Sequence, residues 1–146
     1  MTLETLKKLL NDYGLKPNKT FGQNFLMDEI VLQDMVDVAE VNSKDIIIEV
    51  GPGITNLTKF LLDKAGQVIA IEKDDQFIPL LNSLKKKNKH FSYLADDILA
   101  VDLYELTKDF LSYKVVANIP YYVTGKIIQK FLATKNKPVS MTLLMQ

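Results

Sequence analysis

The chain has 146 residues, no cysteine, a formal net charge of +0 and 47% hydrophobic residues. This length allows one domain with a sizeable core, and no apolar run approaches the roughly 20 residues that a membrane-spanning helix needs. The lack of cysteine excludes disulfides and thiolate metal sites, and the neutral charge argues against a chain that binds nucleic acid by charge alone. We expect a cytoplasmic protein with no metal ion and no membrane partner.

The first two expected elements are helices. Apolar spacing predicts a helix from about Thr2 to Tyr13, and Gly14 would end it. A turn-rich loop follows, and Asp28 would cap a second helix that reaches about Glu40. The buried stripe of this second helix is expected to consist of Val31, Met35 and Val38.

Strands and helices then alternate along the chain. Strands are expected at residues 46–50, 68–71, 90–94, 114–117 and 139–144. Three helices are expected between them: one that ends at residue 65, one over residues 76–85 and one over residues 124–132. A short helical or irregular stretch is expected near residues 104–110. This alternation predicts an α/β fold, a right-handed parallel sheet with helices on both faces. The pattern stops before such a sheet is complete, so we expect its C-terminal strands to be truncated.

A glycine turn ends the strand Ile46–Val50. Gly51-Pro52-Gly53 follows four β-branched residues and one acid, and an apolar helix pattern starts directly after it. Glycines at a strand-to-helix turn let the backbone approach a ligand closely, and the helix N-terminus offers free N–H groups. About 20 residues later stands Glu72, at the distance where an acid commonly binds ribose hydroxyls.

Polar side chains stand at the ends of four expected strands. They are Glu49, Glu72, Asp97 (or its neighbour Asp96) and Asn118. A single acid after a strand is most often a cap or a turn former. Because the carboxyl ends of parallel strands meet at one edge of a sheet, four in succession favour a shared ligand site.

The ligand can be narrowed by motifs that are missing. Asn56 occupies the place of the third glycine of a dinucleotide fingerprint, no phosphate-binding Gly-Lys-Ser/Thr is present, and all 18 basic residues are lysines. A nucleoside cofactor without phosphate suits such a site, and S-adenosylmethionine is one. Glu72 would bind its ribose hydroxyls, the acid after the third strand its adenine amino group, and the glycine turn its methionine end.

Asn118-Ile119-Pro120-Tyr121 is the most specific motif. The amide oxygen of Asn118 and a backbone carbonyl at Ile119 or Pro120 can accept the hydrogens of a purine amine, and this turns its nitrogen lone pair toward an incoming methyl group. Proline fixes the loop, and Tyr121 offers a flat face on which a base can stack. A tight turn with a core tyrosine is the alternative reading.

Five segments together resemble the ribosomal RNA adenine N6-dimethyltransferase family, in the family's order and spacing. These segments are residues 21–26 (Phe-Gly-Gln-Asn-Phe-Leu), 49–53, 71–72, 97–99 (Asp-Ile-Leu) and 118–122. The resemblance implies a Rossmann-like class I S-adenosylmethionine-dependent methyltransferase fold. It implies cofactor-binding residues Asn24, Leu26, Gly51, Glu72, Asp97 and Asn118, and catalytic residues Asn118, Pro120 and Tyr121. Asp97 is preferred over Asp96 because Asp-Ile-Leu matches the family's pattern.

The resemblance also implies a function and a domain organisation. The reaction would be dimethylation of adenine N6 at two adjacent adenosines of small-subunit rRNA, a step of ribosome biogenesis, by a monomer that binds the rRNA or the pre-ribosomal small subunit. Residues 1–27 would form an N-terminal helix and cofactor loop and residues 28–146 the βα core, whereas the family's C-terminal helical domain would be absent.

Two alternatives stay open. One is an adenine N6-methyltransferase of large-subunit rRNA that confers antibiotic resistance; such enzymes tend to lack the Gly-Pro-Gly turn, so Pro52 favours the small-subunit enzyme. The other is a non-catalytic cofactor-binding module in ribosome assembly.

Overall fold

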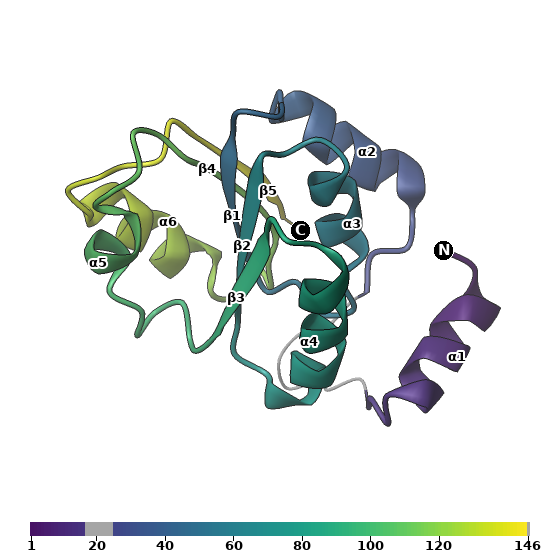
Figure 1. Cartoon of the computed structure of the whole chain (residues 1–146). Coiled ribbons are helices and arrows are strands. Elements are labelled where there is room, and N and C mark those ends of the chain that lie inside the picture. The colour runs from purple at the N-terminus through teal and green to yellow at the C-terminus, as the bar shows by residue number, and fades with distance from the viewer. Residues whose placement is uncertain (17–24, 146) are drawn as a thin grey trace.

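Five parallel strands with helices on both sides make up the chain in the computed structural model, which describes residues 1–16 and 25–145 (Figure 1). The strands are β1 (Ile46–Val50), β2 (Gln67–Glu72), β3 (Phe91–Ala95), β4 (Lys114–Asn118) and β5 (Ser140–Leu144). All four pairings are parallel, and the order across the sheet is β3-β2-β1-β4-β5. Each predicted strand is present, with its ends shifted by no more than one residue, so the predicted α/β fold is confirmed.

The helices pack in two layers. They are α1 (Leu3–Asp12), α2 (Glu29–Val38), α3 (Asn56–Leu62), α4 (Ile78–Lys87), α5 (Leu103–Thr107) and α6 (Thr124–Ala133), with a 3-10 turn η2 (Asp75–Phe77) before α4. Figure 1 shows α2, α3 and α4 on one side of the sheet and α5 and α6 on the other.

Side chains alternate between the two faces of each strand, which is why both layers find an apolar surface. In β1, Ile47 belongs to the core under α2 and α3, whereas Ile48 belongs to the core under α6. In β4, Val116 and Val115 divide in the same way. All four side chains are fully buried, as expected for the centre of a sheet covered on both faces.

Helix α1 belongs to a third, smaller core. Its Leu6 is buried with Ile54 of the loop after β1 and with Phe77 and Leu80 near the start of α4. Thr2 caps the helix by accepting a hydrogen bond from the Thr5 N–H, and Gly14 follows its end with a φ of 63°. The predicted first helix is therefore confirmed.

Helix α2 begins as predicted but buries a different stripe. The Asp28 carboxylate accepts hydrogen bonds from the N–H groups of Ile30 and Val31, as an N-cap does. The predicted stripe was right at Met35 but wrong at Val38, which is 73% exposed, and Val31 is only half-buried. Leu32 and Val36 are buried beside Met35. Their spacing of three and four continues to Ala39, so this face points at the sheet.

Two other helix boundaries differ from the sequence pattern. Helix α3 ends at Leu62 rather than near Ala65, because the N–H groups of Gly66 and Gln67 both bond to the Asp45 carbonyl and lead the chain into β2. Regular helix in α4 starts only at Ile78, after the 3-10 turn, with Pro79 in its first turn. This delay is the one that proline at this point predicts. No helix in the described ranges is long and apolar enough to cross a membrane.

Candidate functional site

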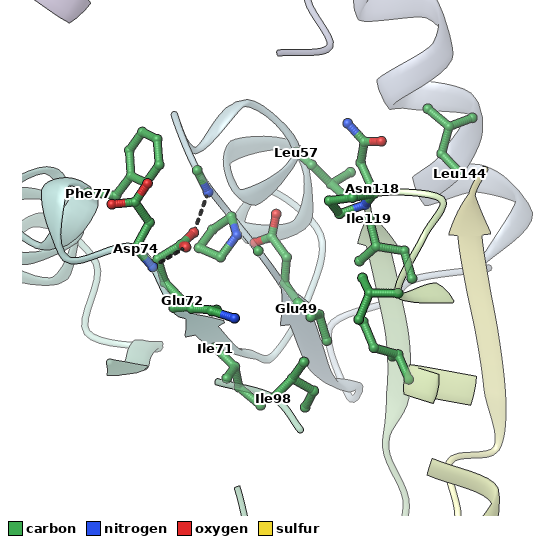
Figure 2. Close-up of a pocket in the computed structure, with 18 of the residues that line it drawn as sticks. Glu49, Leu57, Ile71, Glu72, Asp74, Phe77, Ile98, Asn118, Ile119 and Leu144 are labelled. Carbon is green, nitrogen blue, oxygen red and sulfur yellow. Dashed lines mark hydrogen bonds between the residues drawn. The ribbon is translucent and has the colours of Figure 1, made fainter. Parts of the chain in front are cut away.

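A cavity of about 530 Å³ opens at the carboxyl ends of the strands (Figure 2). It lies where the strand order changes direction, because the chain passes from β1 to β2 on one side and returns to β4 on the other. Ligands bind at such switch points in open α/β sheets. The fold therefore places a crevice where the sequence has its polar strand ends.

The predicted site residues that the structure describes all line this one cavity. They are Leu26, Gly51, Glu72, Asp97, Asn118, Pro120 and Tyr121. Asp96, the alternative to Asp97, lines it as well. Asn24 lies outside the described residues. The predicted positions thus come together from five separate stretches of chain, while the role of each residue stays a prediction.

Glu72 ends β2 and already organises the cavity wall. Its Oε2 accepts a hydrogen bond from the Gly53 N–H at 3.0 Å, and its Oε1 accepts one from the Asp74 N–H at 2.9 Å (Figure 2). Burial raises the pKa of this carboxyl, and the two backbone donors oppose the rise. A carboxylate has about four acceptor sites, so Glu72 can hold this loop and still accept hydrogen bonds from a ligand.

The turn after β1 is held in place by backbone and side-chain bonds. The Gly51 N–H donates to the Ile71 carbonyl of β2 at 2.9 Å, and Gly51 and Gly53 have φ angles of 68° and 51°. Asn56 donates from its side-chain amide to the Leu26 carbonyl at 2.9 Å. The residue that breaks the dinucleotide fingerprint therefore fixes the predicted N-terminal loop residue against the turn.

Asp97 follows β3, the strand that pairs with β2, and lines the cavity. Its Oδ1 accepts from the Leu99 N–H at 2.9 Å, and its Oδ2 pairs with Lys73 Nζ at 2.9 Å. The Leu99 N–H and the lysine together hold the pKa of Asp97 below its usual value. Asp96 is the more exposed of the two acids and accepts a hydrogen bond from the Asp97 N–H. Both acids thus keep free acceptor sites at the cavity.

The segment after β4 forms the mouth of the cavity. The Pro120 carbonyl accepts hydrogen bonds from the Val123 N–H at 3.3 Å and from the Thr124 hydroxyl at 3.1 Å. Tyr121 is 67% exposed, and its ring meets Tyr122 edge to face at 5.9 Å. The alternative reading of a core tyrosine at this position is wrong for Tyr121.

Sequence reasoning did not find two lining residues, Phe77 and Asp74, and placed a third, Glu49, at the shared strand edge without a role. Phe77 closes one wall, packing edge to face on Phe25 at 6.2 Å, and Asp74 caps the 3-10 turn beside it. Glu49 lies between Glu72 and Asn118 in Figure 2, with its carboxyl group in the cavity wall. The acid at the end of the first strand was the signal that placed Glu49 at this edge, whereas no local pattern points to Phe77.

The charges around the cavity select for cations. Five lining residues carry carboxyl groups, Glu49, Glu72, Asp74, Asp96 and Asp97, against a single lysine, Lys73, which pairs with Asp97. Such a wall favours a ligand with positive charge and hydrogen-bond donors and disfavours phosphate. No cluster of residues suited to hold a metal ion occurs in the part of the chain that the structure describes.

Comparison with known proteins gives relatives over nearly the whole chain. Ribosomal RNA small subunit methyltransferase A of Clostridium botulinum (strain Kyoto / Type A2) is 44% identical over 140 residues, which are 96% of this chain and 51% of the relative. The protein of the same name from Dehalococcoides mccartyi is 41% identical over 140 residues, 96% of this chain and 48% of the relative. The chain spans about half the length of these curated relatives.

Two solved structures share the fold at 25% sequence identity. The 23S rRNA methyltransferase ErmE aligns with a TM-score of 0.70 over 81% of this chain and 47% of its own. A dimethyladenosine transferase from Plasmodium falciparum aligns with a TM-score of 0.69 over 84% of this chain and 43% of its own. The fold is thus the class I S-adenosylmethionine-dependent methyltransferase fold.

Residues 14–146 match the family described as "Ribosomal RNA adenine dimethylase". This match includes every strand, the cavity and the segment from Asn118 to Tyr122. The chain belongs to the ribosomal RNA adenine dimethylase family.

Proposed function

We propose that this protein binds S-adenosylmethionine in the cavity and dimethylates adenine N6 at two adjacent adenosines of small-subunit rRNA. The observation that carries the proposal is the acidic cavity at the switch point of the sheet, in a chain of this family. The relatives that match at 44% identity bear the name of a small-subunit rRNA methyltransferase, which supports that substrate over large-subunit rRNA.

The lining residues suit S-adenosylmethionine in their chemistry. Glu72 would accept the ribose hydroxyls, Asp97 or Asp96 the adenine amine, and the Gly51 turn would lie along the amino-acid end, with Leu26 and Asn24 closing the site. The excess of carboxyl groups suits a cationic cofactor without phosphate. When bound, the cofactor supplies a methyl group that its positively charged sulfur makes electrophilic.

The loop after β4 would hold the target adenine. Asn118 would accept one N6 hydrogen through its amide oxygen. The Pro120 carbonyl already accepts two hydrogen bonds from its own loop, so the Ile119 carbonyl is the better second acceptor. The role of Pro120 is then to fix this loop.

Tyr121 would bind the base by stacking. Its exposed ring stands at the cavity mouth, and a base stacked on an aromatic ring gains about 1–3 kcal/mol. The adenine must leave its own stack to reach this ring, so a single-stranded or looped target suits the site. Catalysis would come from alignment of the amine and from carbonyl dipoles that stabilise charge developing on its nitrogen.

The remaining expectations belong to the same proposal. The partner would be small-subunit rRNA or the pre-ribosomal small subunit, and the protein would act in the cytoplasm as a monomer. Residues 1–27 would serve as the N-terminal helix and cofactor loop, and residues 28–146 as the βα core.

Methylation assays with labelled S-adenosylmethionine test the proposal. We expect methyl incorporation into small-subunit rRNA within immature small subunits. Incorporation into large-subunit rRNA alone would show the antibiotic-resistance type of activity instead. Cofactor binding without incorporation into either RNA would show a non-catalytic assembly module.

The substitution Asn118→Ala tests the role of the loop. Turnover should fall by roughly 10²-fold through the loss of a group that acts in the transition state, while cofactor affinity changes less. Asn88→Ala is the matched control, because Asn88 bonds to the Leu84 carbonyl at the end of α4, away from the cavity. Near wild-type turnover of Asn118→Ala would refute the amine-acceptor role.

A further inference from the structure

Glu49 is a buried acid that the proposed reaction does not use. Glu49 is the fourth residue of β1, is only 1% exposed and lines the cavity. Its Oε2 is buried without a hydrogen-bond partner among the described residues. An acceptor in that position is available to a ligand.

Burial makes the charged form of this carboxyl unfavourable. Removal from water raises the pKa of Glu49 to about 8, the charge of Glu72 adds to the rise, and the Thr58 hydroxyl on α3 opposes it. An isolated buried carboxylate is costly and becomes neutral instead. Burial therefore favours the neutral form of the Glu49 carboxyl.

No described cation around the cavity compensates Glu49. Glu72 ends β2 and Asp74 follows it, whereas Asp96 and Asp97 follow β3. The one lysine among the lining residues, Lys73, pairs with Asp97 at 2.9 Å. On the elements packed against β1, Lys59 of α3 is exposed, and Lys114 of β4 pairs with Asp45 at 2.9 Å, at the opposite end of the strand. A positive charge for Glu49 must therefore come with a ligand.

We propose that Glu49 is uncharged in the ligand-free protein and releases its proton to solvent when a cationic ligand enters the cavity. The O–H bond of the carboxyl breaks, the proton passes to the buffer, and the carboxylate pairs with the charge of the ligand. The inference rests on the proposed function, because S-adenosylmethionine is the cation concerned. It makes Glu49 a residue that selects the charged cofactor and links its binding to pH.

Calorimetry with S-adenosylmethionine tests this inference on the wild-type chain and Glu49→Gln. Glutamine has the shape of the neutral acid but cannot ionise. The wild-type-to-variant affinity ratio should rise by up to about tenfold per pH unit between about pH 6 and pH 8, the limit for release of one proton. Titrations in two buffers of different ionisation enthalpy should show more proton release by the wild type than by the variant.

The amino group of the free ligand titrates as well, with a pKa of about 8. Because the same free ligand binds both proteins, this titration cancels in the affinity ratio. If Glu49→Gln does not fold, the ¹³C chemical shift of the Glu49 carboxyl in the wild type replaces it. That shift should report a neutral acid near pH 7 and a carboxylate after S-adenosylmethionine is added.

The outcomes separate the two proposals. An affinity ratio that is constant with pH, or a Glu49 carboxyl that is already ionised without ligand, would overturn the inference and leave the proposed function standing. A wild-type chain that binds no S-adenosylmethionine at any pH would overturn both. Greater proton release by the wild type than by Glu49→Gln would support both.

Discussion

Three residues beside the cavity hold left-handed backbone. Gly51 and Gly53 have φ angles of 68° and 51°, and Thr55 has 65°. Glycine adopts this conformation without strain, whereas a residue with a side chain loses roughly 1–2 kcal/mol. Thr55 is therefore a strained position: its side chain is buried, and its hydroxyl lacks a partner among the described residues. A strained residue therefore stands in the turn that leads from β1 into α3, next to the cavity-lining residues.

Gly51→Ala should lower both stability and cofactor affinity. A Cβ at Gly51 meets nothing within 4 Å, so the loss of about 1–2 kcal/mol comes from the backbone alone. The added methyl would occupy the cavity that Gly51 lines. Urea unfolding gives the stability, and calorimetry with S-adenosylmethionine should show an affinity at least several-fold weaker.

Gly14→Ala is the matched control for this substitution. Gly14 has a φ of 63°, a Cβ there also meets nothing within 4 Å, and the residue is not part of the cavity. It should lose similar stability and keep full affinity. Equal affinities of the two variants would contradict a cofactor role for Gly51.

At the scale of elements, the side chain of Lys114 connects a helix and two strands. Lys114 begins β4, and its Nζ donates to the carbonyls of Ala39 and Glu40 after α2, at 3.1 and 2.8 Å. It also donates to the Asp45 carboxylate before β1 at 2.9 Å. The carbonyls at a helix end have no partner within the helix and attract positive charge. Lys114 thus supplies these partners and ties α2, β1 and β4 together.

Lys114→Ala should destabilise the chain by about 2–3 kcal/mol, because it leaves the largely buried Asp45 carboxylate and two carbonyls with fewer donors. Lys108→Ala breaks the exposed pair of Lys108 with Glu105 and should change stability by less than about 0.5 kcal/mol. Denaturant unfolding compares the two. A similar small effect for both would show that Lys114 is not a connection between elements.

The elements themselves could largely be predicted, because their signals are local. Runs of β-branched residues gave the strands, and Asp28 and Pro79 marked helix starts. The contacts that shape the site could not be predicted in this way. Asn56 reaches Leu26 across 30 residues, and Lys114 reaches Glu40 across 74. Such pairs depend on the tertiary fold, which has no local sequence signal.

At the scale of the whole molecule, parallel topology explains why the candidate site could be predicted at all. Every parallel strand delivers its end to the same edge, so the residues after β1, β2, β3 and β4 had to meet once the strands were right. The same logic placed Glu49 at this edge but could not tell that its buried Oε2 has no hydrogen-bond partner among the described residues. Its environment depends on which face of β1 meets α3 and on what that helix offers.

Buried acids at this edge also set the pH dependence of folding. Burial raises the pKa values of Glu49 and Glu72 in the folded chain, so above their ordinary value the folded state binds more protons than the unfolded state. Stability from these groups therefore falls as pH rises from about 4.5 toward the raised values. Asp37 and Asp97 have lowered pKa values, and the stability they contribute is lost only as pH falls below their ordinary range.

Glu49→Gln should consequently gain stability over the wild type as pH rises from about 5 to about 8. The difference in the free energy of unfolding should grow by at most about 1.4 kcal/mol per pH unit. The reason is that the folded wild type keeps a proton on Glu49 that the unfolded chain releases, whereas glutamine does not titrate. Urea unfolding of the ligand-free chains across this range measures the difference. Glu4→Gln, on the exposed face of α1, makes the same chemical change outside the core and supplies the reference slope. Parallel pH curves for Glu49→Gln and the wild type would mean that the Glu49 carboxyl is already ionised in the folded chain.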